Sequence, residues 1–297
     1  MAVRALQADG AGGLDVLTLR NVPAPAAKPG QVLVRTVAST INPHDIKMRA
    51  RPHLTFPITL GSDVAGVVVE SDAPDYRPGD RVIAMTLDLE EGFGAWTDLI
   101  ALNPDQLGHA PERVALTDAA TIPLAGLAGL QLWRALALSP GDRVLVTGAA
   151  GAIGGFVVQL AVHAGMRVDG LVSRPNVIDS VKSLGAGFVT DDPDALPAHA
   201  YTAIVDPIRV PSGGVDVRKL VTDGGHYVAV GRNESGIPAG QAVNVDDDPA
   251  GLSHLVTLVD DGALTLRVAA HYGLHEFYDA HERFLGGGLS GKVVLHL

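Results

Sequence analysis

The sequence predicts an α/β protein in which a β-rich domain precedes a doubly wound parallel sheet, and three observations lead to this fold class. Short β-branched runs alternate with Gly and Pro residues up to residue 118. Strand and helix patterns then alternate, which is how a parallel sheet acquires helices on both faces. From about Arg267 the short strands return. We therefore expect residues 1–118, completed by 267–297, to form one domain and residues 119–266 to form another.

In the β-rich part and at the end of the chain, β-branched runs between turn signals mark the strands. We expect strands at residues 31–37, 64–70 and 80–84. Near the end of the chain, an amphipathic pattern predicts a helix over residues 276–285, and an apolar run predicts a strand over residues 291–295.

In the second domain, short apolar runs alternate with longer helical patterns. We expect strands at residues 143–147, 167–172, 187–190, 203–205 and 226–230. We expect helices at residues 153–164 and 177–184. The acidic run from Asp246 to Asp248 is too short for an acidic tail, and we expect it to cap the helix that follows.

The composition limits the possible functions. A chain of 297 residues with 47% hydrophobic content can bury a substantial core. The net charge of −11 and the lack of a basic run argue against nucleic acid as a partner, because phosphate backbones are bound by clustered Lys and Arg. Without cysteine there is no disulfide and no sulfur-ligated zinc. No apolar segment develops before Asp9, so we expect no signal peptide, no membrane span and a cytoplasmic protein.

The stretch VTGAAGAIGG, residues 146–155, lies between a predicted strand and a predicted helix, and its glycines are three residues apart. In this context the pattern is typical of a turn that holds a dinucleotide: the second glycine lets the backbone approach a pyrophosphate, and the third lets the helix pack closely. The first-turn amides would face the phosphate oxygens. A glycine pattern alone also occurs in purely structural turns. We predict that the cofactor is bound by Gly148, Ala150, Gly151, Ala152, Ile153 and Gly154.

The residues after the second strand of this domain indicate which dinucleotide binds. A carboxylate about 20 residues after the glycines would bind the ribose hydroxyls of NAD, but the chain has Ser173, Arg174 and Asn176 there. These side chains suit a 2′-phosphate, because Arg forms charge-assisted bonds to phosphate. We therefore predict NADPH as the cofactor. The alternative is that Ser173 and Asn176 cap the next helix.

Further motifs occur in a specific order over nearly the whole chain. They are PGQVLVRTVASTINPHDIKMR (29–49), LGSDVAGVV (60–68), YRPGDRV (76–82), GAWTD (94–98), AATIPLAGLAGLQLW (119–133), GDRVLVTGAAGAIG (141–154), LGA (184–186) and GGLSGKVVL (287–295). Together they resemble the medium-chain dehydrogenases/reductases, and within them the zinc-free quinone oxidoreductase branch. The resemblance implies a GroES-like catalytic domain from both chain ends and a Rossmann domain between them, with the active site in the cleft. It also implies a homodimer formed through the Rossmann sheet.

The same motifs show which zinc ligands the chain lacks. Zinc alcohol dehydrogenases of the superfamily have Cys where Asn42 stands, and Gly-His-Glu where Gly61, Ser62 and Asp63 stand. A lone Asp63 cannot replace three protein ligands, so we expect no metal. Without a Lewis acid, the hydride acceptor must already be electrophilic, as quinones and α,β-unsaturated carbonyls are.

Polar residues that could assist at the carbonyl occur in the stretch INPHDIK, residues 41–47. We predict Asn42 as a neutral donor near the nicotinamide or the carbonyl, and Lys47 as a cation that binds ribose or polarises the carbonyl. Asp45 would hold Lys47 in place. The alternative is that Asn42 caps a short helix with Pro43 at its first position, while Lys47 is a solvated surface group.

Other residues lie where the resemblance implies contact with nicotinamide, ribose or pyrophosphate. They are Pro123, Asp206, Val230, Gly231 and Lys292. The loop after Asp206 departs from the resemblance, because it begins with Pro207 and Ile208 where many members have Thr-Val-Gly-Gly.

The resemblance implies NADPH-dependent hydride transfer to a small hydrophobic quinone or α,β-unsaturated carbonyl. We expect the loops at residues 49–57, 85–93 and 233–245 to shape the substrate pocket. Two alternatives stay open at this point. One is an enoyl reductase acting on acyl thioesters, and the other is an NADPH-binding structural or sensor protein with negligible turnover.

Overall fold

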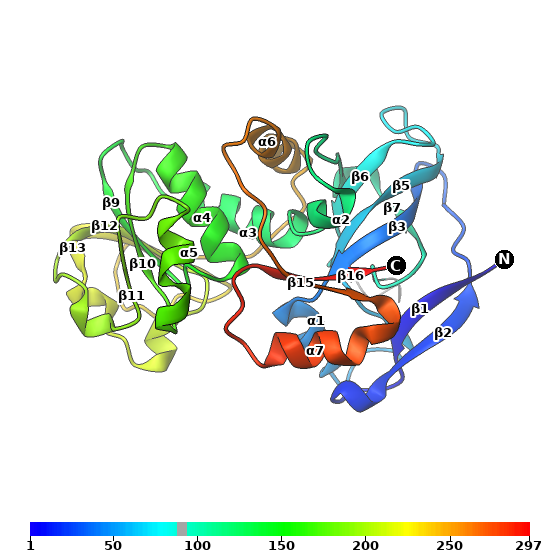
Figure 1. Cartoon of the computed structure of the whole chain (residues 1–297), viewed down its shortest axis with the longest axis horizontal. Helices are drawn as coiled ribbons and strands as arrows, with labels where there is room; N and C mark the ends of the chain where they lie inside the picture. Colours follow the sequence, from blue (N-terminus) through cyan, green and yellow to red (C-terminus); the bar gives the residue numbers. More distant parts are fainter. Residues whose placement is uncertain (88–93) are drawn as a thin grey trace. The chain divides into compact units, whose positions relative to one another are not determined.

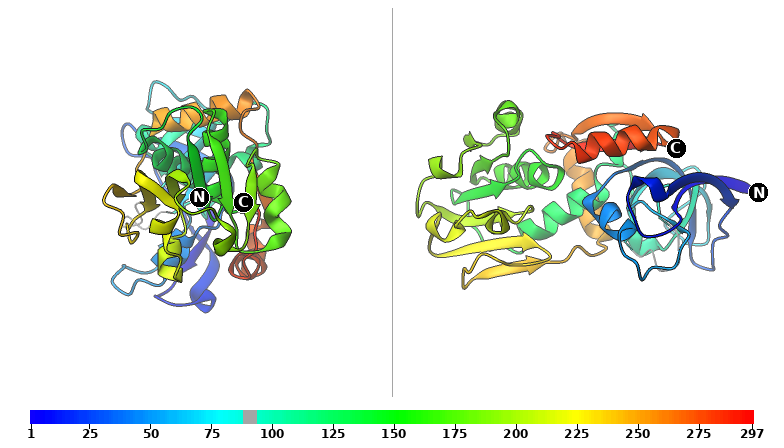
Figure 2. Two further views of the ribbon diagram at one scale, coloured as in Figure 1. Left: turned by 90° about the vertical axis from the view of Figure 1, so that its left-hand side faces the viewer. Right: turned by 90° about the horizontal axis from the view of Figure 1, so that it is seen from below.

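The computed structural model describes residues 1–87 and 94–297, and it divides into two compact units (Figure 1). Unit 1 comprises Met1–Leu124, Asp247–Gly287 and Lys292–Leu297, and unit 2 comprises Ala125–Asp246 and Gly288–Gly291. Both chain ends therefore belong to unit 1 (Figure 2). Of the predicted pocket loop at residues 85–93, residues 88–93 lie outside the described part of the chain.

Unit 1 consists mainly of β-strands, which pair in two sheets. One sheet has the order β2-β1-β4, and the other has the order β15-β16-β3-β5-β6-β8 with β7 also paired to β3. The strands are β1 (Ala2–Ala8), β2 (Leu17–Pro23), β3 (Val32–Thr40), β4 (Ile58–Thr59), β5 (Asp63–Ser71), β6 (Arg81–Met85), β7 (Leu99–Leu102), β8 (Leu107–His109), β15 (Val268–Gly273) and β16 (Lys292–His296). The predicted strands at 31–37, 64–70, 80–84 and 291–295 are confirmed as β3, β5, β6 and β16.

Alternation of buried and exposed side chains explains why these segments form strands. In β3, Val32 and Val34 are buried and Arg35 is exposed, so every second side chain enters the core. Val64 and Val82 of the neighbouring strands β5 and β6 belong to the same buried cluster. The hydrophobic core of this sheet is therefore formed by β-branched residues that the sequence pattern identifies.

The helices of unit 1 are short segments around these sheets. They are α1 (Pro43–Arg49), α2 (Leu116–Ala119), α6 (Pro249–Asp260) and α7 (Phe277–Leu285), while α3 (Pro123–Arg134) begins in unit 1 and continues in unit 2. The Asp248 side chain caps α6 as expected, because it accepts a hydrogen bond of 2.7 Å from the Gly251 amide. None of the helices in the described ranges is both long enough and apolar enough to span a membrane.

Unit 1 extends further along the chain than the β-rich domain that the sequence predicts, since it also contains residues 247–266. The reason is that α6 packs on strand β8, where the side chain of Leu252 covers Gly108. A Cβ atom on Gly108 would lie 3.1 Å from the Leu252 Cβ atom. This tertiary contact has no signal in the local pattern of strands and helices.

Unit 2 contains a parallel sheet in the order β11-β10-β9-β12-β13-β14. Its elements are β9 (Arg143–Thr147), α4 (Ala152–His163), β10 (Arg167–Leu171), α5 (Ile178–Lys182), β11 (Phe188–Thr190), β12 (Tyr201–Asp206), β13 (Val221–Val230) and β14 (Gly240–Val243). This is the strand order of a Rossmann fold, with helices α4 and α5 packed on β9, β10 and β11 (Figure 1). The predicted fold class is confirmed.

The connection from β12 to β13 contains no α-helix. It consists of two short 3-10 turns, Val210–Gly213 and Val217–Lys219. Pro207 and Pro211 each remove a backbone donor, and the Gly213–Gly214 pair has low helix propensity. A crossover helix is therefore disfavoured by the residues themselves.

Candidate functional site

The glycine turn joins β9 to α4 in unit 2, and its backbone requires glycine. Gly148 has a φ of 55°, in the left-handed region that favours glycine. Gly151 stands at the N-cap of α4, and its amide donates to the Gly148 carbonyl at 2.8 Å. The Gly155 amide then donates to the Gly151 carbonyl at 2.9 Å and begins the helical hydrogen bonding. The turn is thus closed by its own backbone, with Ala150 buried in it.

Gly154 allows the first turn of α4 to pack directly on this loop. A Cβ atom on Gly154 would lie 2.3 Å from the Gly148 carbonyl oxygen and 2.9 Å from the Ala149 Cα atom, which is closer than real Cβ contacts. The amides of Ala152 and Ile153 precede the first intrahelical hydrogen bond, so they have no acceptor within the helix. Amides in this position can donate to a bound anion. This backbone fits the phosphate groups of a dinucleotide.

The carboxyl ends of the parallel strands bring most of the predicted cofactor residues to one edge of the sheet. Strand β9 pairs with β10 on one side and with β12 on the other, so the chain order reverses at β9. Ligands of open α/β sheets bind outside such a switch point. Val230 ends β13 at this edge, and Gly231 follows with a φ of 75° and an amide that donates to the Val243 carbonyl at 2.9 Å.

The loop after β10 carries the residues that we predict to select NADPH. Ser173, Arg174 and Asn176 are all exposed. The guanidinium of Arg174 lies against the Gly288 backbone, because a Cβ atom on that glycine would meet a guanidinium nitrogen at 2.1 Å. Neither Ser173 nor Asn176 is an N-cap residue: Arg174 precedes the 3-10 turn Pro175–Val177, and it makes no capping bond. The three polar side chains therefore have no role in starting a helix.

Asp206, at the end of β12, is fully buried and bonded within the chain. Its Oδ1 accepts from the Thr147 hydroxyl at 2.5 Å and from the Ile208 amide at 3.3 Å. Its Oδ2 accepts from the Tyr227 hydroxyl at 2.6 Å and from the Val210 amide at 2.8 Å. A nucleotide could use this carboxylate only by displacing one of these donors, so the geometry favours a role in holding the loop.

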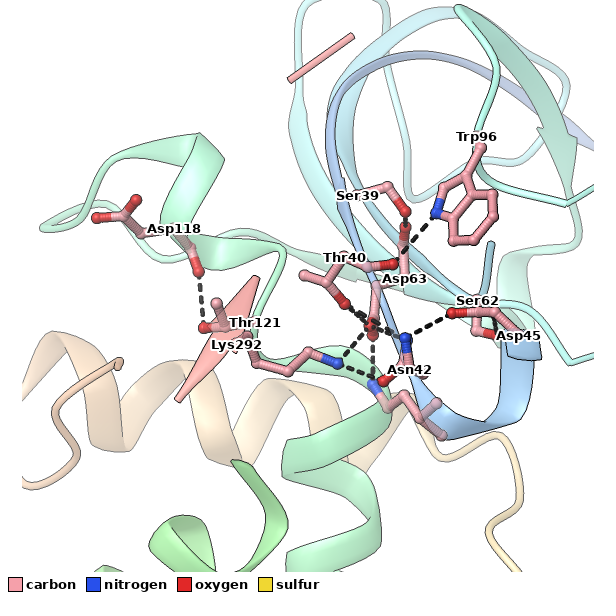
Figure 3. A network of polar contacts seen from close by, with 11 residues as sticks. Ser39, Thr40, Asn42, Asp45, Ser62, Asp63, Trp96, Asp118, Thr121 and Lys292 are labelled. Carbon is pink, nitrogen blue, oxygen red and sulfur yellow. Dashed lines mark hydrogen bonds and ion pairs between the residues drawn. The ribbon is translucent and has the colours of Figure 1, made fainter. Parts of the chain in front are cut away.

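Unit 1 contains a buried cluster of polar side chains around Asp63, at the start of β5 (Figure 3). The cluster consists of Ser39, Thr40, Asn42, Asp45, Ser62, Asp63, Trp96 and Lys292. Lys292 is 5% exposed and extends from β16 toward Asn42 and Asp63, with its ammonium 3.0 Å from the Asp63 carboxylate. Four separate segments of the chain therefore meet at one buried ion pair.

Asp63 is the centre of this cluster because four donors converge on its carboxylate. Its Oδ2 accepts from the Lys292 ammonium, from the Asn42 amide group at 2.9 Å and from the Thr40 hydroxyl. Its Oδ1 accepts from the Leu124 amide at 2.7 Å, in the first turn of α3. Helix N-termini favour negative charge, so Asp63 also anchors the start of α3, whose first residue is Pro123.

Asn42 occupies the N-cap position of α1 with Pro43 following it, as the structural alternative predicts. Its side chain, however, makes no capping bond: the carbonyl oxygen accepts from the Lys292 ammonium, and the amide group donates to Asp63 and, at 3.4 Å, to Thr40. Asn42 is 4% exposed. The side chain is therefore engaged within unit 1.

Asp45 lies in the same cluster, but Lys47 does not. The Asp45 carboxylate accepts from the Asn42 backbone amide at 2.7 Å and from the Ser62 hydroxyl at 2.6 Å. Lys47 is exposed on the other side of α1. The expectation that Asp45 holds Lys47 is wrong, because residues two positions apart on a helix point to different faces. The cation of the buried cluster is Lys292.

Burial gives Asp45 an unusual titration. Desolvation raises the pKa of its carboxyl group to about 7, against the effect of the hydrogen bond from Ser62. In the unfolded chain the pKa is about 4. Between these two pH values the folded protein binds a proton that the unfolded chain has released, so the free energy of unfolding falls as the pH rises through this range.

We expect Asp45→Asn to remove this pH dependence. Between pH 4 and pH 8 the native sequence should lose on the order of 3 kcal/mol of unfolding free energy relative to the variant. Urea denaturation at several pH values measures the difference. The control is Asp223→Asn, which removes an exposed carboxylate and should follow the native curve. Parallel curves for Asp45→Asn and the native protein would contradict the assignment.

Comparison with known proteins identifies the family. A model of the alcohol dehydrogenase GroES-like domain matches residues 28–118, and a model described as zinc-binding dehydrogenase matches residues 177–295. The 2-methylene-furan-3-one reductase of Solanum lycopersicum is 29% identical over 96% of this chain and 76% of its own length. The chain belongs to the medium-chain dehydrogenase/reductase superfamily. The resemblance that the motifs predict is confirmed.

Other members of the superfamily match with different coverage. The chloroplastic NADPH-dependent alkenal/one oxidoreductase of Arabidopsis thaliana is 32% identical over 74% of this chain and 60% of its own length, so the match spans about three fifths of that relative. The solved structure of the quinone oxidoreductase from Coxiella burnetii has a TM-score of 0.90 at 25% identity, over 100% of both chains. The matches also include a trans-enoyl reductase of Aspergillus flavipes.

The donor set of this member does not fit the zinc site of the zinc-dependent dehydrogenases in the superfamily. The side-chain oxygen of Asn42 accepts from the Lys292 ammonium, and Ser62 donates to Asp45. The oxygens of Asp63 are occupied by donors of the chain. Among residues 1–87 and 94–297, no group of three or more His, Cys, Asp or Glu side chains is placed to hold a metal ion.

Sequence reasoning missed how many residues this cluster contains. Thr40 and Ser62 are fully buried or nearly so, and Lys292 pairs with Asp63 rather than remaining a surface group. One signal was present: polar residues follow directly on apolar strand residues in TVASTIN and LGSD, where a purely structural strand end would need none. The partner of these residues, Lys292, lies 250 positions from Asn42, and no local pattern connects them.

Proposed function

We propose that the chain is an NADPH-dependent oxidoreductase that transfers a hydride to a quinone or an α,β-unsaturated carbonyl without zinc. The observation that carries the proposal is the glycine turn, where a Cβ atom on Gly154 would lie only 2.3 Å from the Gly148 carbonyl oxygen. Such a turn gives phosphate oxygens direct access to the backbone amides of α4. Two relatives named for enone reduction and a quinone oxidoreductase of the same fold support the substrate class.

When bound, NADPH supplies the hydride, and the chemistry of that step belongs to the cofactor. The acceptor gains a hydride at its conjugated carbon, and the π electrons of its conjugated system shift to the carbonyl oxygen. A proton from water then completes the reduction. The backbone amides of Ala152 and Ile153 would hold the pyrophosphate, and Arg174 would hold the 2′-phosphate. Lys47 is proposed to provide positive charge at the ribose or the carbonyl, because it is a cation exposed on α1.

Lys292 and Asp63 have a positioning role in this proposal. Their ion pair holds Asn42, and through Asn42 it fixes the start of α1, where Lys47 is carried. The ammonium group bonded to Asn42 and Asp63 also places a cation in the interior of unit 1. A buried charge of this kind is retained only when it is paired, and the hydrogen bonds to Asp63 provide that pairing.

A panel of acceptors tests the proposed activity. The protein is mixed with NADPH and, separately, with a quinone, a small enone and an enoyl thioester, and the absorbance band of the reduced cofactor is followed. We expect consumption with the quinone or the enone. The trans-enoyl reductase among the relatives favours the thioester as the second candidate, and consumption with the thioester alone would select it. Binding of NADPH without consumption across the panel would contradict both and would indicate a sensor or structural protein.

Arg174→Ala tests the choice of cofactor. We expect the dissociation constant for NADPH to rise about tenfold to a hundredfold, because a charge-assisted bond to the 2′-phosphate is lost. NADH lacks that phosphate, so its affinity should stay within about twofold. Fluorescence titration measures both. The matched control is Arg167→Ala, which removes an exposed arginine from the opposite end of β10. Equal losses for NADH and NADPH would remove the assignment.

The homodimer stays a prediction of the family resemblance, and the cytoplasmic location stays a prediction of the sequence. Light scattering after size-exclusion chromatography gives the mass of the particle in solution. A mass near twice that of the 30.7 kDa chain is expected, and a mass near that of a single chain would contradict the dimer.

A further inference from the structure

The loop after β12 contains a backbone strain that the proposed function does not use. Arg209 has φ 59° and ψ 60°, and it is one of only two non-glycine residues with a positive φ in the described ranges. L-residues other than glycine, Asn and Asp seldom occupy this region. Strain of this kind persists where the surroundings enforce it, and it is concentrated at functional sites.

The surroundings of Arg209 enforce this conformation from both sides. The Asp206 carboxylate accepts from the amide of Ile208, which precedes the arginine, and from the amide of Val210, which follows it. Asp206 is itself fixed by the hydroxyls of Thr147, at the end of β9, and Tyr227, in β13. The two strands that flank β12 therefore determine the backbone at Arg209.

The loop lies beside the glycine turn. The side chain of Ile208 covers Gly148, because a Cβ atom on that glycine would lie 2.8 Å from the Ile208 Cγ2 atom. Ile208 is nevertheless 57% exposed, so this part of the loop reaches solvent. Arg209 is the next residue. It follows β12, which pairs with β9 on the side opposite to β10 and Arg174.

The guanidinium of Arg209 is available to a ligand. The side chain is partly buried, and in the described part of the chain it has neither a hydrogen-bond nor an ion-pair partner. Its charge reaches Tyr227, where it opposes the rise that burial and the bond to Asp206 cause in the pKa of the hydroxyl group. A cation on a fixed backbone that lacks a partner of its own is suited to an anion.

We propose that Arg209 is a second phosphate-binding arginine of the dinucleotide site. The proposal rests on the proposed function, because it assumes that a dinucleotide binds across the glycine turn. The pyrophosphate is the expected contact, since it sits over β9 and the helix start, whereas the 2′-phosphate belongs to the loop after β10. The Asp206 carboxylate then acts as a positioning group that holds the arginine in place, which explains why its oxygens are occupied by the chain.

The test measures the affinities of Arg209→Asn, Arg209→Lys and the native protein for NADH and for NADPH. Fluorescence titration at several salt concentrations gives these affinities. Asn tolerates the left-handed conformation, so the fold is kept while the charge is removed. We expect Arg209→Asn to weaken the binding of both nucleotides about tenfold to a hundredfold and to reduce the salt dependence of binding. Arg209→Lys should retain part of the affinity. The control is Arg218→Gln, which removes an exposed arginine of the same connection.

The outcomes separate this proposal from the one on which it rests. Loss of affinity for NADPH alone would overturn the pyrophosphate contact, because NADH carries the same pyrophosphate and should be weakened equally. Unchanged affinities in Arg209→Asn, with native NADPH binding intact, would overturn the inference and leave the proposed function standing. A loss without any change in salt dependence would also overturn it, because an ionic contact would be absent. If the native protein binds neither nucleotide, both proposals fall.

Discussion

Gly154→Ala is expected to abolish useful dinucleotide binding, with a rise of about a hundredfold or more in the dissociation constant for NADPH. The added methyl group would meet the Gly148 carbonyl oxygen at 2.3 Å and the Ala149 Cα atom at 2.9 Å. Both obstructing atoms are backbone, so α4 must move away from the turn and take its amides with it. We also expect the free energy of unfolding to fall by about 3 kcal/mol.

The matched control for this prediction is Gly187→Ala. Gly187 lies in the same unit at the opposite edge of the sheet, just before β11, and a Cβ atom there would have only an ordinary contact at 3.9 Å. Its NADPH affinity should therefore equal that of the native protein. Titration of both variants, with urea denaturation in parallel, distinguishes a lost site from a lost fold. Full NADPH affinity in Gly154→Ala would show that the nucleotide does not rest on this turn.

Lys292→Met is expected to have the largest effect on stability in unit 1. The substitution removes the cation from a cluster in which the Asp63 carboxylate is fully buried. Breaking one side of a buried ion pair costs about 3–5 kcal/mol, because the remaining charge has no counterpart. Urea denaturation at neutral pH measures the loss.

A second variant separates the charge effect from the loss of packing. In Lys292→Met/Asp63→Asn the buried charge is removed together with its partner, so much of the stability should return. The single side-chain oxygen of an Asn at position 63 would still accept from the Leu124 amide, while its NH2 group would take the place of the oxygen that accepts from Asn42. A double variant less stable than Lys292→Met would show that the ammonium acts by packing rather than by pairing with Asp63.

The sequence predicts the parts of this fold that depend on short-range patterns. The strand at 143–147 matches β9 residue for residue, and the helix predicted from Ile153 begins one residue earlier, at Ala152. Glycines at a strand-to-helix junction can be interpreted from the sequence because the geometry requires them: only a residue without Cβ fits at Gly154. Fold class and the glycine turn are therefore readable from neighbouring residues alone.

The rest of the candidate site depends on contacts that no window of sequence contains. Lys292 meets Asn42 across 250 positions and Asp63 across 229. Choosing Lys47 as the cation near Asp45 followed from sequence proximity, but the helical geometry of α1 turns Lys47 away. Asp206 was predicted to bind the cofactor, yet hydroxyls from two neighbouring strands occupy its oxygens. In both cases, residues from strands that are distant in the sequence determine the partners of the side chain.

The departure after Asp206 illustrates how a mismatch in a motif can carry information. Pro207 and Ile208 replace a glycine-rich loop of the resemblance, and they lead to an arginine in a left-handed conformation beside the glycine turn. Such a conformation is easily provided by Gly. The chain uses Arg209 instead, and the Asp206 carboxylate fixes the amides on both sides of it. A charged group at this position is therefore gained at the cost of backbone strain.

We propose that this chain binds NADPH on backbone amides and reduces a conjugated carbonyl with no metal ion. The most direct measurement is the consumption of NADPH by protein that has been treated with a chelator and shown to be metal-free, with a small enone as acceptor. Our account predicts the same rate before and after treatment and no increase when zinc is added. Loss of the activity on chelation, with recovery on addition of zinc, would contradict it.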